Sequence, residues 1–432
     1  MSSIINLTEN KLEFGTHYFD ISFNHISSLF HLHSLFKTPF TDNFFYQIGP
    51  LSIIIFVNTF LIEKIFNRKK NDYLDHVFYL YLFCLVFVNV FFYRLAEHGT
   101  DRSAQILFFL TFLLCLTLAQ YKTIANKTFE IITITFTLIV TLKSFYILYS
   151  ILLLLIYFKF FRVSDFFKFI KKFPIIYLCL LTLFLMLINS LAVSGCFIYP
   201  VVATCGETFF WGYGKEKVLL AMEWYEVWSK AGASPTYRVE NYSEYIRGLN
   251  WLPNWFDNYF FNKVSDYLLG ILLVILIFII SFKIKILKLK DFKNYNSFYF
   301  ILILLFLEWF LNHPALRYGG YVLIYLIIVM PVAVLLSNQK YTFKKKLKPI
   351  KIIFCITIIV FASRNINRLI NENSIYDYNL LKNPVYNIQS NYFNMQNRKE
   401  SYFVDPKMCD PENSKKDLIC KKIKSFNFYY KN

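Results

Sequence analysis

The chain has 432 residues, of which 56% are hydrophobic and 20% aromatic, and its formal net charge is +18. A soluble domain divides a similar apolar fraction into short amphipathic pieces, whereas this chain gathers it into runs long enough for a hydrocarbon core of roughly 30 Å. The composition therefore excludes an ordinary soluble protein. The positive charge then indicates membrane topology rather than a nucleic-acid partner.

The apolar runs predict an all-α, polytopic membrane protein with about ten transmembrane helices. One stretch, 129–158, could be a single long helix, but that would move the basic segment 159–172 to the wrong side of the membrane. A tight hairpin that turns near Lys143 avoids this, and it leaves two short spans. The ten predicted spans are 45–65, 77–93, 106–120, 129–142, 144–158, 174–195, 266–282, 297–311, 319–336 and 350–363.

Lysine and arginine residues assign the sides of the membrane. Five loops between predicted spans are strongly basic, which is typical of the cytoplasmic face. The remaining segments are mixed or acidic and are predicted to face outward. They are residues 1–44, the large segment 195–266 between the sixth and seventh helices, and the C-terminal segment 364–432, so that the transmembrane bundle covers 45–363.

The eight cysteines fit this topology. Four lie within predicted spans, four lie in predicted outer segments, and no cysteine falls in a cytoplasmic loop. An outer location permits disulfides. Pairing between near neighbours is the simplest connectivity, although a cross-link between the two outer segments also fits. The outer four are Cys196, Cys205, Cys409 and Cys420.

The N-terminal stretch, 1–44, is predicted to be an external loop with one amphipathic helix near Ile21–Phe36. A chain that begins outside needs a preceding segment to carry it across the membrane. We therefore expect that a first membrane helix is missing, through a truncated or mis-assigned start. The histidines of this stretch do not have a spacing diagnostic of a metal site.

The polar stretch 94–105 separates the second and third predicted spans and is dense in charge. Two acids four residues apart can act as a general base, or can bind a divalent cation that grips a phosphate. The arginines can bind phosphate directly. In the competing interpretation, the acids pair with these arginines and only hold the loop. The candidates are Arg94, Glu97, His98, Asp101 and Arg102.

The outer segment 195–266 is rich in tryptophan. Residues 218–230 have helical spacing, which places Trp224 and Trp228 on one face with Glu223 beside them. Aromatic rings at a membrane surface commonly serve as anchors. Rings beside acids also form platforms for sugars, because the C–H face of a pyranose packs on indole. As a group these residues favour a carbohydrate or lipid-headgroup site.

A third polar cluster follows the eighth predicted span. Glu308 lies about one turn inside that span, where a carboxylate is costly unless it faces the bundle interior or a wet cavity. His313, Arg317 and Tyr318 follow at the outer lip. Arg317 is the best single candidate for binding a phosphate, and the alternative is that it snorkels to lipid headgroups.

Four sequence islands carry a family resemblance: 97–107 (EHGTDRSAQIL), 194–205 (SGCFIYPVVATC), 228–235 (WSKAGASP) and 313–321 (HPALRYGGY). With the short hairpin spans, they resemble GT-C-type glycosyltransferases, and more closely the bacterial membrane proteins of surface-carbohydrate loci. The resemblance implies transfer of sugar from a polyprenyl-phosphate donor at the outer face of the bacterial inner membrane. It also implies a carboxylate as base or metal ligand in the first outer loop. That role falls on Asp20 if 1–44 is the remnant of that loop, and otherwise on Glu97 or Asp101.

The expected function is therefore that of a glycosyltransferase-like protein in surface polysaccharide or glycolipid assembly. Its expected partners are the bilayer and a polyprenyl-phosphate-linked sugar, a divalent cation is a candidate cofactor, and the long loops face the periplasm. One alternative is a transport or polymerase-type protein that handles a lipid-linked glycan, for which residues deep in the spans matter most. The other alternative is a non-catalytic component of a glycan-assembly complex.

Overall fold

The computed structural model describes residues 7, 12–19, 21–36, 48–66, 75–93, 99–121, 124–233, 239–283, 296–337, 343–376 and 418–431. Helices dominate these ranges. Among the described residues, six helices are long and apolar enough to cross a membrane, or seven if the bent pair Ser144–Phe160 and Val163–Lys172 forms one span. The structure therefore agrees with the expected helical membrane architecture, as far as the length and apolar character of its helices show. The count of about ten spans remains a prediction.

Helices occupy all ten of the predicted span positions. The longer ones are α3 (Ile48–Phe66), α5 (Gly99–Leu118), α9 (Ile175–Ser194), α13 (Ser265–Phe282), α15 (Gly320–Ser337) and α16 (Phe343–Tyr376). The shorter ones are α4 (Asp75–Val86), which continues as the π-helical stretch Phe87–Phe91, α6 (Asn126–Leu142), α7 (Ile151–Phe160) and α14 (Asn296–Asn312).

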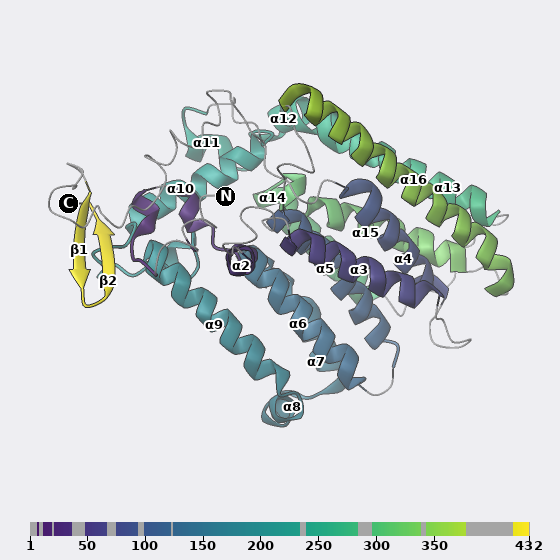
Figure 1. Ribbon diagram of the computed structural model, residues 1–432, viewed down its shortest axis with the longest axis horizontal. Helices are drawn as coiled ribbons and strands as arrows, with labels where there is room; N and C mark the ends of the chain where they lie inside the picture. Colours follow the sequence, from purple (N-terminus) through teal and green to yellow (C-terminus); the bar gives the residue numbers. More distant parts are fainter. Residues whose placement is uncertain are drawn as a thin grey trace.

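The helix α5 forms the middle of the bundle, and its neighbours surround it (Figure 1). In the most apolar stretch of α5, 94% of the residues are buried, whereas in that of α9 only 11% are buried. Both helices are apolar on all sides, which in a soluble protein would require burial. A lipid environment removes that requirement, because acyl chains cover an exposed apolar face as well as a protein core does.

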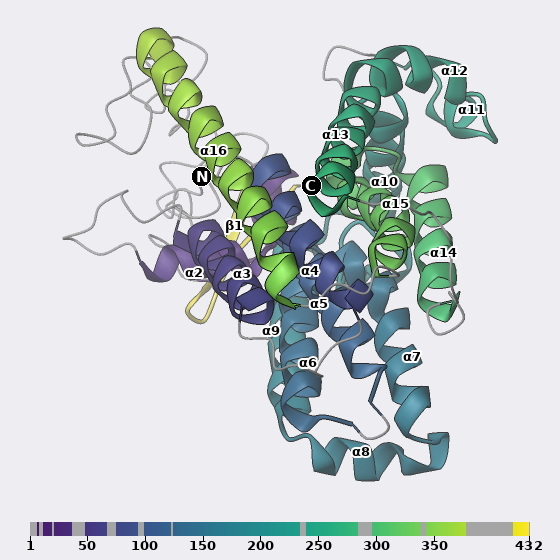
Figure 2. The ribbon, with the colours of Figure 1, turned by 90° about the vertical axis from the view of Figure 1, so that its right-hand side faces the viewer.

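The two ends of the bundle differ. Three helices of the large polar segment lie at one end, and the short basic helix α8 (Phe166–Lys172) lies at the other (Figure 2). We name the first the α10 end. Its three helices are α10 (Lys215–Lys230), α11 (Tyr242–Ile246) and α12 (Leu252–Trp255).

Two local features at the α10 end determine where the polar residues lie. The helix α5 begins at Gly99 rather than near Ile106 as predicted, so Asp101 and Arg102 lie in its first turn and not in a loop. An acid is favourable in a first helical turn because it faces the positive end of the helix dipole. At Lys143 the backbone becomes extended, with φ −149° and ψ 111°, before a 3-10 segment leads into α7. This turn agrees with the predicted break in the run 129–158.

The N- and C-terminal parts of the described chain pack together at the α10 end. The antiparallel hairpin β1 (Ile419–Ile423) and β2 (Phe426–Tyr430) is extended by Phe14, whose N–H donates to Asn427 O at 3.0 Å and whose carbonyl accepts from Tyr429 N at 2.9 Å. The Glu13 carboxylate accepts hydrogen bonds of 3.1 Å from both residues' side chains. We name this arrangement the terminal clasp.

Two predicted segments differ from the structure in detail. The external helix expected near Ile21–Phe36 is a 3-10 turn at Ile21–Asn24 followed by α2 (Ser28–Leu35). The predicted boundary at residue 363 falls inside α16, which continues to Tyr376. The hydrophobic pattern weakens at this point, but backbone hydrogen bonding continues the helix.

We expect the substitution Gly15→Ala to open the terminal clasp. Gly15 has φ +74°, and an added Cβ would collide with the backbone carbonyl of Tyr429. For a residue that has a side chain, the left-handed conformation alone is unfavourable by about 1 to 2 kcal/mol, and the collision adds to this. Hydrogen exchange of residues 418–431 should therefore accelerate by at least tenfold. The matched control is Gly214→Ala, with φ +85° and nothing within 4 Å. Equal exchange in the two variants would contradict this account of the clasp.

Candidate functional site

Asp101 is the centre of an ion cluster at the α10 end. Its side chain is 3% exposed, and its Oδ1 lies 2.9 Å from Lys143 Nζ. Its Oδ2 accepts from Arg317 Nε at 3.0 Å and from Arg317 Nη2 at 2.7 Å. One carboxylate therefore holds two cations that come from separate parts of the chain, and the cluster keeps a net positive charge.

The turn that carries Arg317 is held by buried polar side chains. Gln105, one turn along α5 from Asp101, is fully buried, donates to Arg317 O at 3.0 Å and accepts from Val322 N at 3.2 Å. Three aromatic side chains bind the backbone of the same turn, so the position of the guanidinium is determined by α5, α12 and α14 together. Trp255 Nε1 donates to Pro314 O at 3.0 Å, and Trp309 Nε1 donates to Ala315 O at 2.9 Å. The Tyr259 hydroxyl accepts from Leu316 N at 2.8 Å.

A cavity of about 510 Å³ opens beside the two cations, and we name it the cation cavity. Glu308 of α14 lines it and is partly exposed there, as expected for a carboxylate inside an apolar helix. The guanidinium of Arg317 packs on the rings of Trp228 and Tyr318, at 5.5 and 5.6 Å from their centroids. Other lining residues are His25, Lys143, Tyr199, Tyr225 and His313. A smaller space of about 230 Å³ shares His25 and Lys143 with it.

The surroundings of both histidines in the cation cavity lower their pKa and so favour the neutral imidazole. Burial, followed by the positive charge of Lys143, lowers the pKa of His25 to about 4. Burial also lowers the pKa of His313. The Nε2 atom of His25 lies 2.9 Å from the Tyr225 hydroxyl, so the ring is held in place. The fixed positive charge in the cavity wall thus comes from Lys143 and Arg317.

Several residues singled out in the sequence meet at this cavity. Glu308, His313, Arg317 and Tyr318 line it. Asp101 pairs with Arg317 from α5, and the ring of Trp228 packs on Arg317 from α10. The contacts of Asp101 match neither interpretation of the charged stretch exactly. It does pair with cations, but these are Lys143 and Arg317. Such a buried, doubly paired carboxylate is suited to hold cations rather than to take up a proton.

Other candidates lie elsewhere. Arg102 packs on the ring of Phe92 at 5.6 Å and lines a different cavity, between α13 and α16. Glu223 and Trp224 lie on α10 outside the lining of the cation cavity, and Trp224 is 44% exposed with its ring against Tyr225. The remaining candidates fall outside the residues that the structure describes. They are Asp20, Arg94, Glu97, His98 and Cys409.

Sequence reasoning did not identify His25, Lys143, Tyr199 or Tyr225 as site residues. Lys143 did carry a signal, because an isolated lysine in the apolar run 129–158 must find an anion or a wet cavity. The contact of His25 with Tyr225 joins residues 200 positions apart, and no local pattern could have indicated it.

A disulfide joins Cys196 to Cys205. The loop between them is further closed by a hydrogen bond from Phe197 N to Thr204 O at 3.1 Å. This loop carries Tyr199 and Pro200, which line the cation cavity, so the disulfide fixes part of the cavity wall. Cys420 also takes part in a disulfide.

No group of three or more His, Cys, Asp or Glu side chains within the described ranges is placed to hold a metal ion. In comparisons with known proteins, a family model described as a domain of unknown function (DUF8201) matches residues 14–324. This range contains the whole ion cluster of Asp101, Lys143 and Arg317. No curated protein and no solved structure matches the chain.

Proposed function

The chain belongs to the family described as a domain of unknown function, DUF8201, and we propose that it is a membrane glycosyltransferase. In this proposal it transfers a sugar from a polyprenyl-phosphate donor during surface polysaccharide or glycolipid assembly. The observation that carries the proposal is the cation cavity. There Lys143 and Arg317, both held by the buried Asp101 carboxylate, border a space of about 510 Å³ together with Glu308 and aromatic rings.

The two cations supply the phosphate-binding part of such a site. Arginine and lysine form their strongest hydrogen bonds with phosphate and carboxylate oxygens. The side chain of Arg317 is 43% exposed although it is paired with Asp101, so donors remain open toward the cavity. Asp101 acts here as a positioning residue. It fixes both cations before a ligand arrives, which is the arrangement that stabilises developing negative charge most effectively.

Glu308 and the aromatic residues supply the sugar-handling part. In the proposed step, the bond between the sugar C1 atom and the donor phosphate oxygen breaks, and its electron pair stays with the phosphate beside Lys143 and Arg317. The acceptor hydroxyl oxygen forms the new bond to C1, and its proton passes to the Glu308 carboxylate. Tyr225 lines the same cavity, and its ring offers a surface on which a pyranose can stack.

We also propose a topology. The α10 end faces the periplasm of a bacterial cell, and about ten helices cross the inner membrane, with the large segment 195–266 outside between the sixth and seventh. The basic helix α8 at the opposite end supports this orientation, since Lys168, Lys171 and Lys172 are typical of a cytoplasmic surface.

The proposal is tested by binding of undecaprenyl phosphate to the full chain in nanodiscs. We expect Arg317→Gln to weaken binding about 10- to 100-fold, because that is the usual contribution of one hydrogen bond to a charged group. Arg247→Gln is the matched control, because Arg247 is exposed at the same end but lies outside the cavity lining. Equal binding by both variants would contradict the proposal. Binding by the wild type without transfer to any acceptor would favour the transport or polymerase-type alternative.

A further inference from the structure

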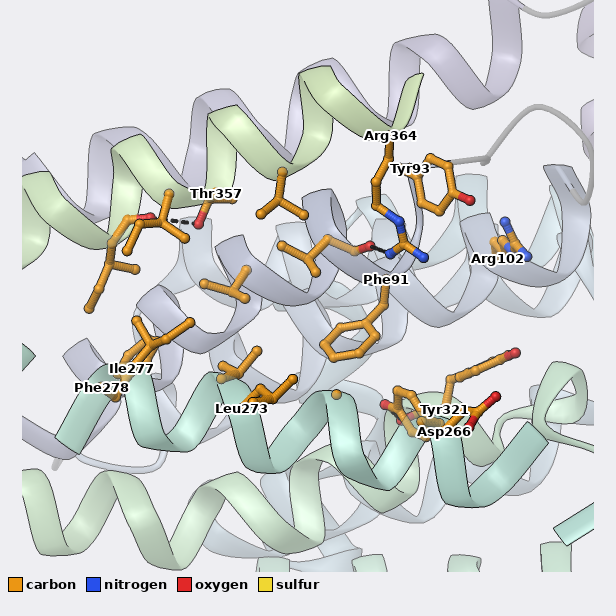
Figure 3. Close-up of a pocket in the computed structure, with 18 of the residues that line it drawn as sticks. Phe91, Tyr93, Arg102, Asp266, Leu273, Ile277, Phe278, Tyr321, Thr357 and Arg364 are labelled. Atoms are coloured by element: carbon orange, nitrogen blue, oxygen red, sulfur yellow. Dashed lines mark hydrogen bonds between the residues drawn. The ribbon is translucent and has the colours of Figure 1, made fainter. Parts of the chain in front are cut away.

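A second cavity, of about 580 Å³, lies between α13 and α16, and its floor is formed by the end of α4 and the π-helical stretch that follows (Figure 3). We name it the lateral groove. No residue that the structure describes lines both this groove and the cation cavity. In the first turn of α5, Asp101 contacts the cations of one cavity, and the next residue, Arg102, lines the other.

One end of the lateral groove is apolar. Leu273, Ile277 and Phe278 line it from α13, and Ile353 and Ile356 line it from α16. The hydroxyl of Thr357 donates to Ile353 O at 2.7 Å, so it offers its proton to the helix and not to the groove. This end is therefore suited to a hydrocarbon chain.

The other end is cationic. Arg364 is fixed there, because its Nη1 donates to Val90 O at 2.8 Å and its guanidinium packs 4.2 Å from the ring centroid of Tyr93. Arg102 and Lys263 line the same end, and among the lining residues that the structure describes Asp266 is the only acid. Among these described residues three cations face one carboxylate, a balance that favours an anionic group.

The length of the groove matches one leaflet of a bilayer. From Ile353 to Arg364 the helix α16 rises by about 16 Å, at roughly 1.5 Å per residue. Half of a hydrocarbon core of about 30 Å is nearly the same. Few residues are buried in the most apolar parts of the two helical stretches that form the groove. The buried share is 28% in Leu252–Phe282 and 22% in Leu347–Ile375. Both helices are thus open to lipid along the groove.

We infer that the lateral groove binds one anionic phospholipid of the surrounding bilayer. Its phosphate headgroup lies at the Arg102, Lys263 and Arg364 end, and an acyl chain follows the apolar wall. The lipid is distinct from the donor of the proposed transfer reaction, because the groove and the cation cavity are separate. This inference goes beyond the proposed function and does not depend on it.

The test is native mass spectrometry of the full chain titrated with phosphatidylglycerol or phosphatidylcholine. We expect one phosphatidylglycerol molecule to bind in preference to phosphatidylcholine. The double variant Arg102→Gln, Arg364→Gln should weaken that binding about 25-fold, since one cation near a lipid surface contributes about fivefold. Val360→Trp, which fills the groove from α16, should reduce the occupancy at least tenfold without altering any charge.

Two controls separate the groove from the general lipid surface. Leu272→Trp places the same ring on α13 at an exposed position outside the groove, and Arg247→Gln removes a distant cation. Both should bind phosphatidylglycerol like the wild type, and all variants should keep the wild-type unfolding temperature within a few degrees. The inference is overturned if Val360→Trp binds normally, if phosphatidylcholine binds equally, if inorganic phosphate displaces the lipid, or if undecaprenyl phosphate displaces it at equal concentration.

Discussion

Replacing Asp101 by asparagine is expected to lower the free energy of unfolding of the full chain by about 2 to 3 kcal/mol. Removing one partner of a fully buried ion pair typically costs about 3 to 5 kcal/mol, because the other charge is left uncompensated. We expect less here, since the Lys143 and Arg317 side chains are 22% and 43% exposed. The loss should appear as a lower midpoint of denaturant unfolding in detergent.

The chain offers a matched control for this effect. Asp165 pairs with Lys168 at 3.6 Å at the α8 end, where the Lys168 side chain is exposed and that of Asp165 is partly exposed. Such solvent-accessible pairs contribute at most about 1 kcal/mol. Asp165→Asn should therefore leave the unfolding midpoint nearly unchanged. Adding Lys143→Met to Asp101→Asn should recover part of the loss, because it removes one of the two uncompensated cations. If Asp101→Asn is as stable as Asp165→Asn, the carboxylate is not the centre of the cluster.

Replacing Glu308 by glutamine is expected to reduce the rate of sugar transfer by about 100- to 10,000-fold, the usual contribution of a positioned general base. Glutamine keeps the size of the side chain and can keep the contact with Asn312, which lies 3.3 Å from Glu308 Oε1. It cannot accept the proton of an acceptor hydroxyl. Binding of undecaprenyl phosphate should stay within about threefold of the wild type, because the cations that hold the phosphate are unchanged.

Two comparisons make the Glu308 result interpretable. Glu216→Gln changes an exposed acid in the first turn of α10 and should leave transfer unaffected. Arg317→Gln should show the opposite pattern to Glu308→Gln, with weaker binding as its main effect. Transfer at the wild-type rate by Glu308→Gln would show that another group accepts the proton. The neutral imidazole of His25 is the next candidate, because it lines the same cavity.

The positions of the helices could be predicted because each depends on a local property, the length of an apolar run. The break at Lys143 was also predictable, since a continuous helix would have put a basic segment on the wrong side. The start of α5 was not, because its first turn is polar and resembles a loop in sequence. The cations that pair with Asp101 in that turn are remote in the chain.

The candidate site was only partly predictable for the same reason. Arg317 and Asp101 each attracted attention as charged residues beside apolar runs, but their pairing joins positions 216 residues apart. Nothing in either local sequence indicates the other. His25 is a clearer example, since its role depends on a cavity assembled from α10, α14 and the turn after α6. A single sequence contains the residues of such a site, but it does not show which of them lie close together in the fold.

The terminal clasp has a consequence for the order in which the protein folds. Phe14 and its hydrogen-bonding partners in β2 lie more than 400 residues apart in the chain. Contacts of such wide sequence separation form late, because closing a long loop costs entropy before any bond compensates for it. Residues 12–19 therefore lack their strand partners until the helical bundle has assembled. Closure of the clasp would then mark completed folding, and protection of Phe14 and Tyr429 amides from exchange should be among the last to appear.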